Sequence, residues 1–519
     1  MSLVRSTGTI GGLTLVSRIL GFVRDMLMAR FVGASFASDA FLVAFRLPNL
    51  FRALFAEGAF ASVFVPMFSR RLAKEDGGTE EARLFAEQAL SVLTVVLLVL
   101  TALMLIFAGP VVWAITGGFR EASPAQFALT VEFCRITFPY LLLISLASLF
   151  GGILNSIGRF WVNAAAPILL NLCLIASLIF FRGHLGIETA RSQSIAVTVS
   201  GVLQLAWVMW ATRKAGIHMK LRRPRLTPQV RELLRVIWPA ALGAGAIQFN
   251  LLVSQLLAAR YLPEGSISYL YYADRLNQLP LGLIGIGIGT AVLPMVSRQL
   301  GAGQHALAQH TQNRAIELVL LLTLPATVAL VINAEPIVQG LLQHGRFSRE
   351  DALASAHALS AFSLGLPAYV LIKVLTPGFY ARSDTKTPVR IALLAMAVNL
   401  ALNIALLHWL AHVGLALSTA IAAWVNAVLL YLALRRREHL ELDARLRRTV
   451  VRLLAATAVT AAVLPWLNPV VAPWMTGSVI DRGIGLAVLG VATGVAYFGT
   501  ALALRAFTLG EIRKQFRRG

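Results

Sequence analysis

Fourteen apolar runs of about 20 residues or more dominate the sequence. A helix needs about 20 predominantly apolar residues to cross the hydrocarbon core of a bilayer. The sequence therefore predicts an all-α polytopic membrane protein with fourteen transmembrane helices. Some runs are long and contain proline (Pro48, Pro280 and Pro367), which predicts bent or tilted helices. The runs span 9–33, 37–70, 84–115, 126–154, 160–181, 192–212, 232–261, 267–299, 314–343, 352–380, 388–409, 413–434, 449–467 and 483–507.

The composition excludes several other classes of protein. Of 519 residues, 57% are hydrophobic and only 13% are charged, more apolar surface than a soluble fold of this length can hide. The net charge of +22 comes mostly from short links between apolar runs, which favours membrane orientation and not nucleic-acid binding. Cys134 and Cys173 both lie in apolar runs, so we expect no disulfide and no metal site. No Walker A loop, HExxH sequence or nucleophile elbow is present, and we expect a protein that is not an enzyme.

The links between the runs predict the orientation of the chain. The link after the sixth run, RKAGIHMKLRRPRLTPQVR, holds seven Lys/Arg, and RRREHLELDARLRR after the twelfth holds six. Links after odd-numbered runs, such as VGASFAS and HWLAHVG, are nearly free of Lys/Arg. The positive-inside rule then places both termini in the cytoplasm. We interpret the first run as a retained helix and not as a cleaved signal peptide.

An internal repeat is visible at an offset of 228 residues. VPMFSRRL at 65–72 returns as LPMVSRQL at 293–300, and further along the chain Pro139 matches Pro367 and Asn171 matches Asn399. The offset equals six runs, so the two halves are expected to be parallel six-helix repeats, a design typical of transporters. We expect a first lobe at 1–215, a second at 216–440 and two extra helices with a basic tail at 441–519.

Formal charges within the first run are the strongest indication of function. Ser17, Arg18, Gly21, Arg24 and Asp25 fall within an arc of about 120° on one helix face. Three ionised residues near the centre of a bilayer would cost on the order of 8–10 kcal/mol unless they face a wet cavity or pair with one another. We interpret this face as the lining of a cavity. The alternative is that Arg24 pairs with Asp25 while Arg18 extends to the interface.

Other apolar runs carry charges as well. The second run contains Asp39, Arg46, Arg52 and Glu57, with Asp39 and Arg46 on one face, and the eighth begins with Asp274 and Arg275. The cations outnumber the acids able to pair with all of them, which predicts an anionic ligand. Guanidinium groups match phosphate oxygens well, so a pyrophosphate or a carboxylate-bearing solute would fit.

A second polar group lies in the second repeat. Asn399 and Asn403 are four residues apart in the eleventh run, and Thr419 lies in the twelfth. Hydrogen bonding between helices explains them best, and a site for a coupling cation is the alternative.

Long motifs resemble those of the MurJ (MviN) family of lipid II flippases within the MOP transporter superfamily. They are SRILGFVRD, SDAFLVAFRLPNLFRALFAEGAFASVFVP, YYADRLNQLPLGLIGIGIGTAVLP and TPGFYARSDTKTPV. The resemblance implies two six-helix lobes around a cationic cavity, with the last two helices forming a groove for a lipid tail. It implies that Arg18, Arg24 and Arg275 are essential cavity residues. Asp25, Asp39, Arg52 and Glu57 match other functional cavity positions, and Asn403 stands where an acidic residue of the family's ion site is expected.

The first hypothesis is therefore a flippase that moves undecaprenyl-pyrophosphate-linked peptidoglycan precursor (lipid II) from the cytoplasmic to the periplasmic leaflet of the bacterial inner membrane by alternating access. Arg18, Arg24 and Arg275 would bind the pyrophosphate together with Arg52. Ser17, Asp25, Asp39, Glu57 and Asp274 would support them. We expect no cofactor, with a membrane potential or ion gradient as driving force. Membrane lipids and cell-wall synthesis proteins are the other expected partners.

Two alternatives remain open at this point. One is an exporter of another polyprenyl-linked oligosaccharide or of drugs, although an exporter of cationic drugs should have an acidic cavity. The other is a membrane scaffold within the cell-wall synthesis complex that transports nothing itself.

Overall fold

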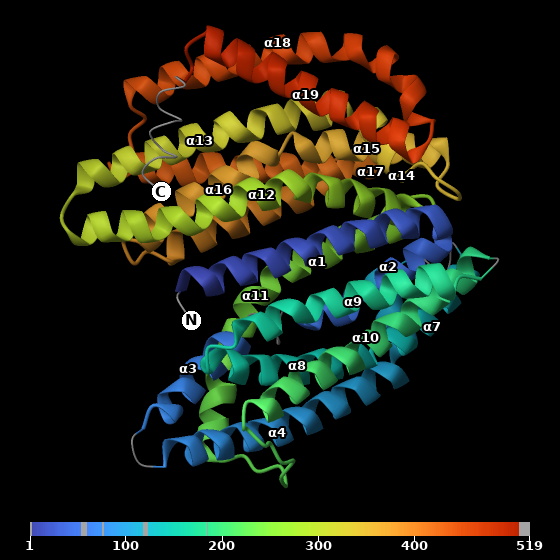
Figure 1. Cartoon of the computed structure of the whole chain (residues 1–519), viewed down its shortest axis with the longest axis vertical. Helices are drawn as coiled ribbons and strands as arrows, with labels where there is room; N and C mark the ends of the chain where they lie inside the picture. Colours follow the sequence, from blue (N-terminus) through green and yellow to red (C-terminus); the bar gives the residue numbers. More distant parts are fainter. Residues whose placement is uncertain (1–2, 53–59, 75–76, 118–122, 184, 508–519) are drawn as a thin grey trace. The chain divides into compact units, whose positions relative to one another are not determined.

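The computed structural model describes residues 3–52, 60–74, 77–117, 123–183 and 185–507, and these ranges are almost entirely helical (Figure 1). No β-strand occurs in them. The first ten helices are α1 (Leu3–Val32), α2 (Phe36–Phe51), α3 (Phe60–Leu72), α4 (Gly78–Ile106), α5 (Ala108–Thr116), α7 (Pro124–Thr137), α8 (Pro139–Ser156), α9 (Phe160–Phe180), α10 (Gly186–Lys214) and α11 (Pro228–Tyr261). They are followed by α12 (Ser266–Gly301), α13 (His305–Ile332), α14 (Ala334–Leu342), α15 (Arg349–Ser363), α16 (Leu366–Tyr380), α17 (Lys386–Arg436), α18 (Ala444–Met475) and α19 (Val479–Ala503).

The predicted apolar runs coincide with these helices, which confirms the class of all-α polytopic membrane protein. Nine helical stretches of the described chain are long and apolar enough to cross a bilayer by length and composition alone. One of the nine, α17, covers two predicted runs and is interrupted at Ala411, where φ is 47° and ψ is −129°. The total of fourteen crossings stays a prediction.

Several predicted runs are two helices joined by a short break. Pro139 opens α8 directly after Phe138, and Pro367 lies in the first turn of α16. A proline in the first turn loses no intrahelical hydrogen bond, so a proline there starts a new helix without a penalty. Pro48 and Pro280, by contrast, lie inside α2 and α12.

The order of helices repeats at the offset that the sequence predicted. Shifting α4 and α5 by 228 residues gives α13 and α14 to within about two residues, and α7 and α8 become α15 and α16 to within about four. The ranges of α9 and α10 fall on the two arms of α17, and α1 falls on α11. The internal six-helix repeat is therefore a property of the fold as well as of the sequence.

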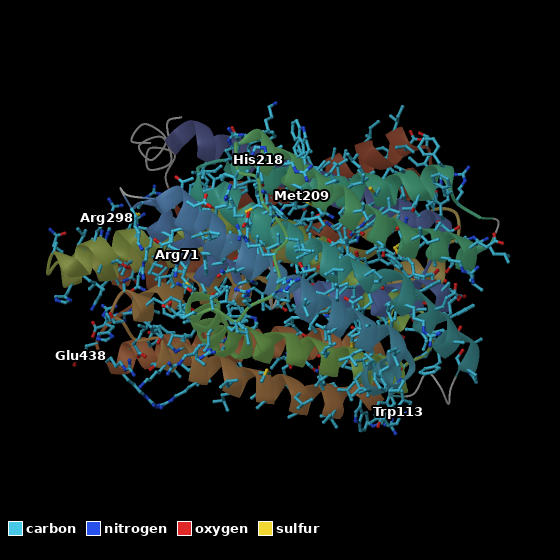
Figure 2. All side chains as sticks on the ribbon, turned by 90° about the horizontal axis from the view of Figure 1, so that it is seen from below. Arg71, Trp113, Met209, His218, Arg298 and Glu438 are labelled. Carbon is cyan, nitrogen blue, oxygen red and sulfur yellow. The ribbon has the colours of Figure 1, made fainter. Side chains whose placement is uncertain are left out.

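The chain forms two compact units. The first comprises Met1–Ser268 and Gly345–Phe347, and the second comprises Tyr269–His344 and Ser348–Gly519. Within the first unit, α1 packs on α9, α10 packs on α8 and α9, and α2 packs on α7. Arg71 and Trp113 lie toward opposite ends of this unit (Figure 2). The predicted lobe boundaries near 215 and 440 stay a prediction.

The short turn Gly345–Phe347 belongs to the first unit because two glycines allow its backbone to approach α1 closely. The Arg346 backbone N–H donates to the Arg30 carbonyl at 2.9 Å. Gly33 and Gly345 both have positive φ, and a methyl group at Gly33 would lie 2.7 Å from the Arg346 carbonyl oxygen. Only glycine tolerates both the left-handed conformation and this contact.

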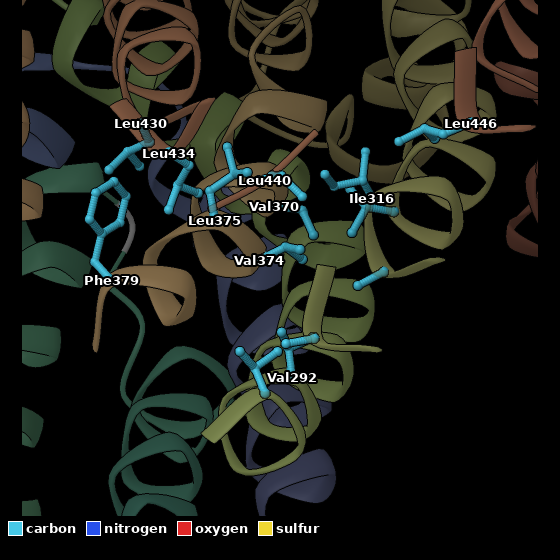
Figure 3. Packing of buried hydrophobic residues seen from close by; sticks show 14 residues of the cluster. Val292, Ile316, Val370, Val374, Leu375, Phe379, Leu430, Leu434, Leu440 and Leu446 are labelled. Carbon is cyan, nitrogen blue, oxygen red and sulfur yellow. The ribbon is translucent and has the colours of Figure 1, made fainter. Parts of the chain in front are cut away.

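The second unit has its own apolar core. Val292 of α12, Ile316 of α13 and Val374 of α16 meet in a buried cluster that continues to Leu434 of α17 and Leu446 of α18 (Figure 3). Within the same unit, α18 packs on both α19 and α13. The two helices beyond the repeat, α18 and α19, therefore pack against α13, which corresponds to α4 of the first half.

The link between α10 and α11 is not helical and is held by a buried acid. Glu87 of α4 is fully buried and accepts hydrogen bonds from the Lys220 backbone N–H, at 3.0 Å, and from the Arg222 side chain. Ser91 accepts from the Arg222 backbone N–H at 2.9 Å. These hydrogen bonds hold the basic link against α4 within the first unit.

Candidate functional site

Arg24 and Asp25 form a buried ion pair on α1. The Arg24 Nη2 and Nε atoms lie 2.7 and 3.0 Å from Asp25 Oδ1. The two residues are 6% and 3% exposed. The positive charge of Arg24 and the negative charge of Asp25 offset each other, which reduces the free-energy cost of burying both groups among apolar helices.

Asn171 of α9 completes this cluster. Its Oδ1 accepts from Arg24 Nη1 at 3.2 Å, and its Nδ2 donates to the Ser17 carbonyl at 2.9 Å. A methyl group at Gly21 would lie 3.6 Å from the same amide. Ser17, Gly21 and Arg24, three of the five residues on the predicted helix face, therefore contact α9, and the interpretation of the face as a cavity lining stays a prediction. The sequence reasoning identified Asn171 only as a repeat position; an isolated amide in an apolar run was the available signal.

Arg18 has a different environment on the same helix. Its side chain is exposed, and it makes no hydrogen bond or ion pair with the described residues. Arg30, near the end of α1, is also exposed, and its guanidinium lies over the Phe31 ring. The structure thus shows the pairing of Arg24 with Asp25, and α1 retains Arg18 as a cation that no described acid offsets.

Asp39 caps the beginning of α12. Its carboxylate accepts from the Gly265 N–H at 2.8 Å, the Ser268 N–H at 2.9 Å and the Ser268 hydroxyl at 2.6 Å. The residue is 2% exposed. A carboxylate at a helix N-terminus satisfies unpaired N–H groups and interacts favourably with the helix dipole. This geometry assigns Asp39 to fixing Gly265 and Ser268 at the start of α12, both of which belong to the first unit.

Arg52 lies at the end of α2 and is half-buried, with its Nε donating to Asn49 Oδ1 at 2.8 Å. Glu57 lies outside the described residues. Arg52 lines a cavity of about 340 Å³ inside the first unit. The same cavity is lined by polar residues that the sequence reasoning missed: Tyr140, Ser148, Asn155, Asn163 and Gln204.

The predicted site residues of the second unit lie in the first half of α12. Asp274 and Arg275 are half-buried. Asp274 accepts from Gln278 Nε2 at 2.5 Å, and the Arg275 guanidinium lies 5.1 Å from the centre of the Tyr271 ring. The ring face attracts the guanidinium electrostatically and helps to hold it in place.

Asn399 and Asn403 contact each other in the first arm of α17. The Asn403 Nδ2 donates to Asn399 Oδ1 at 3.3 Å, and both residues are buried. The Thr419 hydroxyl donates to the Leu415 carbonyl at 3.0 Å on its own helix. No group of three or more His, Cys, Asp or Glu residues in the described chain could hold a metal ion. The cation site stays a prediction.

Comparisons with known proteins agree with one another. A family model described as "Lipid II flippase MurJ" matches residues 28–505. The "Probable lipid II flippase MurJ" of Rhizobium tropici is 43% identical over 523 residues, covering all of this chain and 97% of that protein. The "Lipid II flippase MurJ" of Burkholderia cenocepacia is 35% identical, covering 96% of this chain and 97% of that protein.

Solved structures show the same fold. "Lipid II flippase MurJ, inward closed conformation" aligns with a TM-score of 0.75 at 24% identity, covering 96% of this chain and 98% of that one. An inward-facing multidrug resistance MATE transporter of the MOP superfamily aligns with a TM-score of 0.66 at 18% identity, covering 81% and 94%. The duplicated helical fold, with a buried ion pair on one of its apolar helices, defines a multi-pass membrane transporter and not an enzyme. Within that class, the chain belongs to the MurJ family of lipid II flippases.

Proposed function

We propose that this protein moves lipid II from the cytoplasmic to the periplasmic leaflet of the bacterial inner membrane by alternating access. Membership in the MurJ family carries this proposal. The charges of the described helices support it: Arg18 has no described acidic partner, and Arg275 lies on an aromatic ring. Such guanidinium groups bind pyrophosphate oxygens by charge-assisted hydrogen bonds.

The buried cluster on α1 has a second role in this proposal. Arg24 is held by Asp25 and Asn171, so its guanidinium is oriented before any ligand arrives. Orientation in advance reduces the entropy cost of binding. Arg18, Arg24, Arg52 and Arg275 remain the proposed ligands of the anionic head group, and the prenyl tail would stay in lipid along α18 and α19.

We also propose an orientation, a driving force and further partners for this transporter. Both termini would lie in the cytoplasm, and the basic links of the chain support this orientation. A membrane potential or an ion gradient would drive transport, and membrane lipids and cell-wall synthesis proteins would be the further partners.

A complementation experiment tests the proposal. Cells depleted of the native protein receive either Arg18→Gln or Arg30→Gln, and lipid II is measured in each leaflet. Both arginines lie exposed on α1, but only Arg18 lies on the face proposed to bind ligand. We expect Arg18→Gln to leave lipid II in the cytoplasmic leaflet and Arg30→Gln to restore transport. Normal transport by an Arg18→Gln protein would contradict the assignment.

A further inference from the structure

The cavity beside Arg52 lies wholly within the first unit and has a volume of about 340 Å³. Its walls come from the end of α2, from α8, from the first half of α9 and from α10. The lining residues of α8 are Tyr140, Ile144, Ser148, Gly152 and Asn155.

The shape of the cavity follows from this spacing. The α8 residues recur every three or four positions, so they form one face of the helix. From the first to the last is a rise of about 22 Å at 1.5 Å per residue. Because a small volume is spread over that length, the cavity is a narrow slot along α8 and not a round chamber.

The chemistry of the slot is polar and cationic. The side-chain amides of Asn155 and Asn163 make no hydrogen bond with the described part of the chain. Gln204 is 2% exposed and uses its Nε2 on the Ser200 carbonyl at 3.2 Å, while its Oε1 accepts from no described residue. Arg52 supplies a positive charge, and no Asp or Glu is among the lining residues that the structure describes. Gln204 is the buried amide of the three, and a buried amide requires a polar partner; Asn155 is half-buried and Asn163 is exposed.

A glycine brings one amide to the edge of the slot. A methyl group at Gly151 would lie only 2.6 Å from Asn163 Oδ1. Glycine at this position therefore allows α9 to hold Asn163 directly against the α8 face. Close packing against Gly151 therefore places the Asn163 amide in the wall of the slot.

We infer that this slot binds the peptide portion of the transported lipid, with Arg52 contacting a peptide carboxylate. This inference rests on the proposed function and names a subsite for one part of that substrate. An extended chain advances about 3.3–3.6 Å per residue, so the lining face of α8 is as long as about six residues of extended peptide. Backbone amides of such a chain alternate donors and acceptors, which Asn155, Asn163 and Gln204 can match. A narrow slot suits an extended chain better than a pair of sugar rings.

Two serines of α8 provide the test and its control. Ser148 and Ser156 are both half-buried, and each hydroxyl donates to the carbonyl four residues earlier at 2.9 Å. Only Ser148 lines the slot. The full-length protein, purified in detergent, is titrated with lipid II, with the same lipid lacking its peptide, and with phosphatidylglycerol.

We expect the unmodified protein to bind lipid II about tenfold more tightly than the peptide-free lipid, as one or two charge-assisted hydrogen bonds would provide. Ser148→Leu should reduce this preference to about twofold or less with unchanged affinity for the peptide-free lipid. Ser156→Leu should keep the preference. Equal binding of the two lipids by the unmodified protein, or a preference that survives Ser148→Leu, would overturn the inference.

The same titration separates this inference from the proposed function. If the unmodified protein binds neither pyrophosphate lipid more tightly than phosphatidylglycerol, the proposed function itself is wrong. If Ser148→Leu no longer binds the peptide-free lipid, the variant has lost its fold, and Asn155→Ala takes its place. That variant removes an amide without adding volume, and we expect the preference for lipid II to fall about threefold or more. An unchanged preference would overturn the inference.

Discussion

Exchanging Asn171 for aspartate tests whether Arg24 contacts the anionic part of the substrate. Asp has nearly the same shape as Asn and keeps an oxygen acceptor for Arg24 Nη1, which now lies 3.2 Å from Asn171 Oδ1. It loses the Nδ2 donor to the Ser17 carbonyl. It also places a second carboxylate beside a guanidinium that already has Asp25 as a partner. The structural change is small, and the change in charge is a full unit.

The size of the effect can be worked out from this geometry. An anion bound on the far side of the guanidinium would lie roughly 6–8 Å from the new carboxylate. At an effective dielectric constant of about 20, two like charges at that separation repel by about 2–3 kcal/mol. Binding should therefore weaken about 30- to 150-fold. The lost hydrogen bond to Ser17 costs only about 0.5–1.5 kcal/mol of stability, and a stronger bond to Arg24 offsets part of it.

The assay is lipid II binding by the purified protein, combined with its thermal unfolding midpoint in the same detergent. Asn171→Ala serves as control because it removes the side-chain hydrogen bonds to Arg24 and Ser17 and adds no charge. We expect it to lower stability by about 2–4 kcal/mol and to weaken binding less than Asn171→Asp does. If Asn171→Asp is folded and binds lipid II as tightly as the unmodified protein, Arg24 does not contact the substrate's charge.

Three further predictions concern stability and pH. Glu87→Ala should lower the free energy of unfolding by about 1–3 kcal/mol, because the Lys220 N–H and the Arg222 side chain lose their shared acceptor. Arg222→Gln should cost less, because it leaves the bond to the Lys220 N–H in place, and an equal cost would contradict this reason. Asp39→Ala should cost about 2–4 kcal/mol by leaving two N–H groups near the start of α12 unsatisfied, measured against Asp39→Asn, which keeps one acceptor. His412 lies in the predicted link after the eleventh run, and its burial lowers its pKa below the ordinary 6.5. The unfolded chain then binds more protons, so stability should fall between pH 7.5 and 5.5, and His412→Gln should reduce that fall in unfolding midpoint.

Much of the fold could be predicted because the bilayer imposes a local requirement on the sequence. Each membrane crossing needs about 20 apolar residues in succession, and this can be counted without knowing what the helix touches. The match of VPMFSRRL with LPMVSRQL indicated the repeat that the helix boundaries later displayed. The break at Phe138 was harder to foresee, because a proline in a long run can bend a helix or begin a new one.

The candidate site was only partly predictable. Periodicity placed Ser17, Gly21 and Arg24 on one face of α1, and the structure shows that face against Asn171. Periodicity also grouped Asp39 with Arg46, whereas Asp39 accepts its hydrogen bonds from the start of α12. A helix face tells which residues point the same way, but not which helix lies opposite them.

The sequence by itself therefore determined the class of fold, the positions of the helices, the internal repeat and the presence of excess positive charge among apolar residues. Only the tertiary structure decided that Arg24 is buried with Asp25, that Asn171 orients it, and that Arg52 lines a slot beside the amides of α8, α9 and α10. The physical reason is the range of the interactions. Apolar length and helical period act along the chain, whereas the partner of a buried polar group depends on which distant helix packs against it.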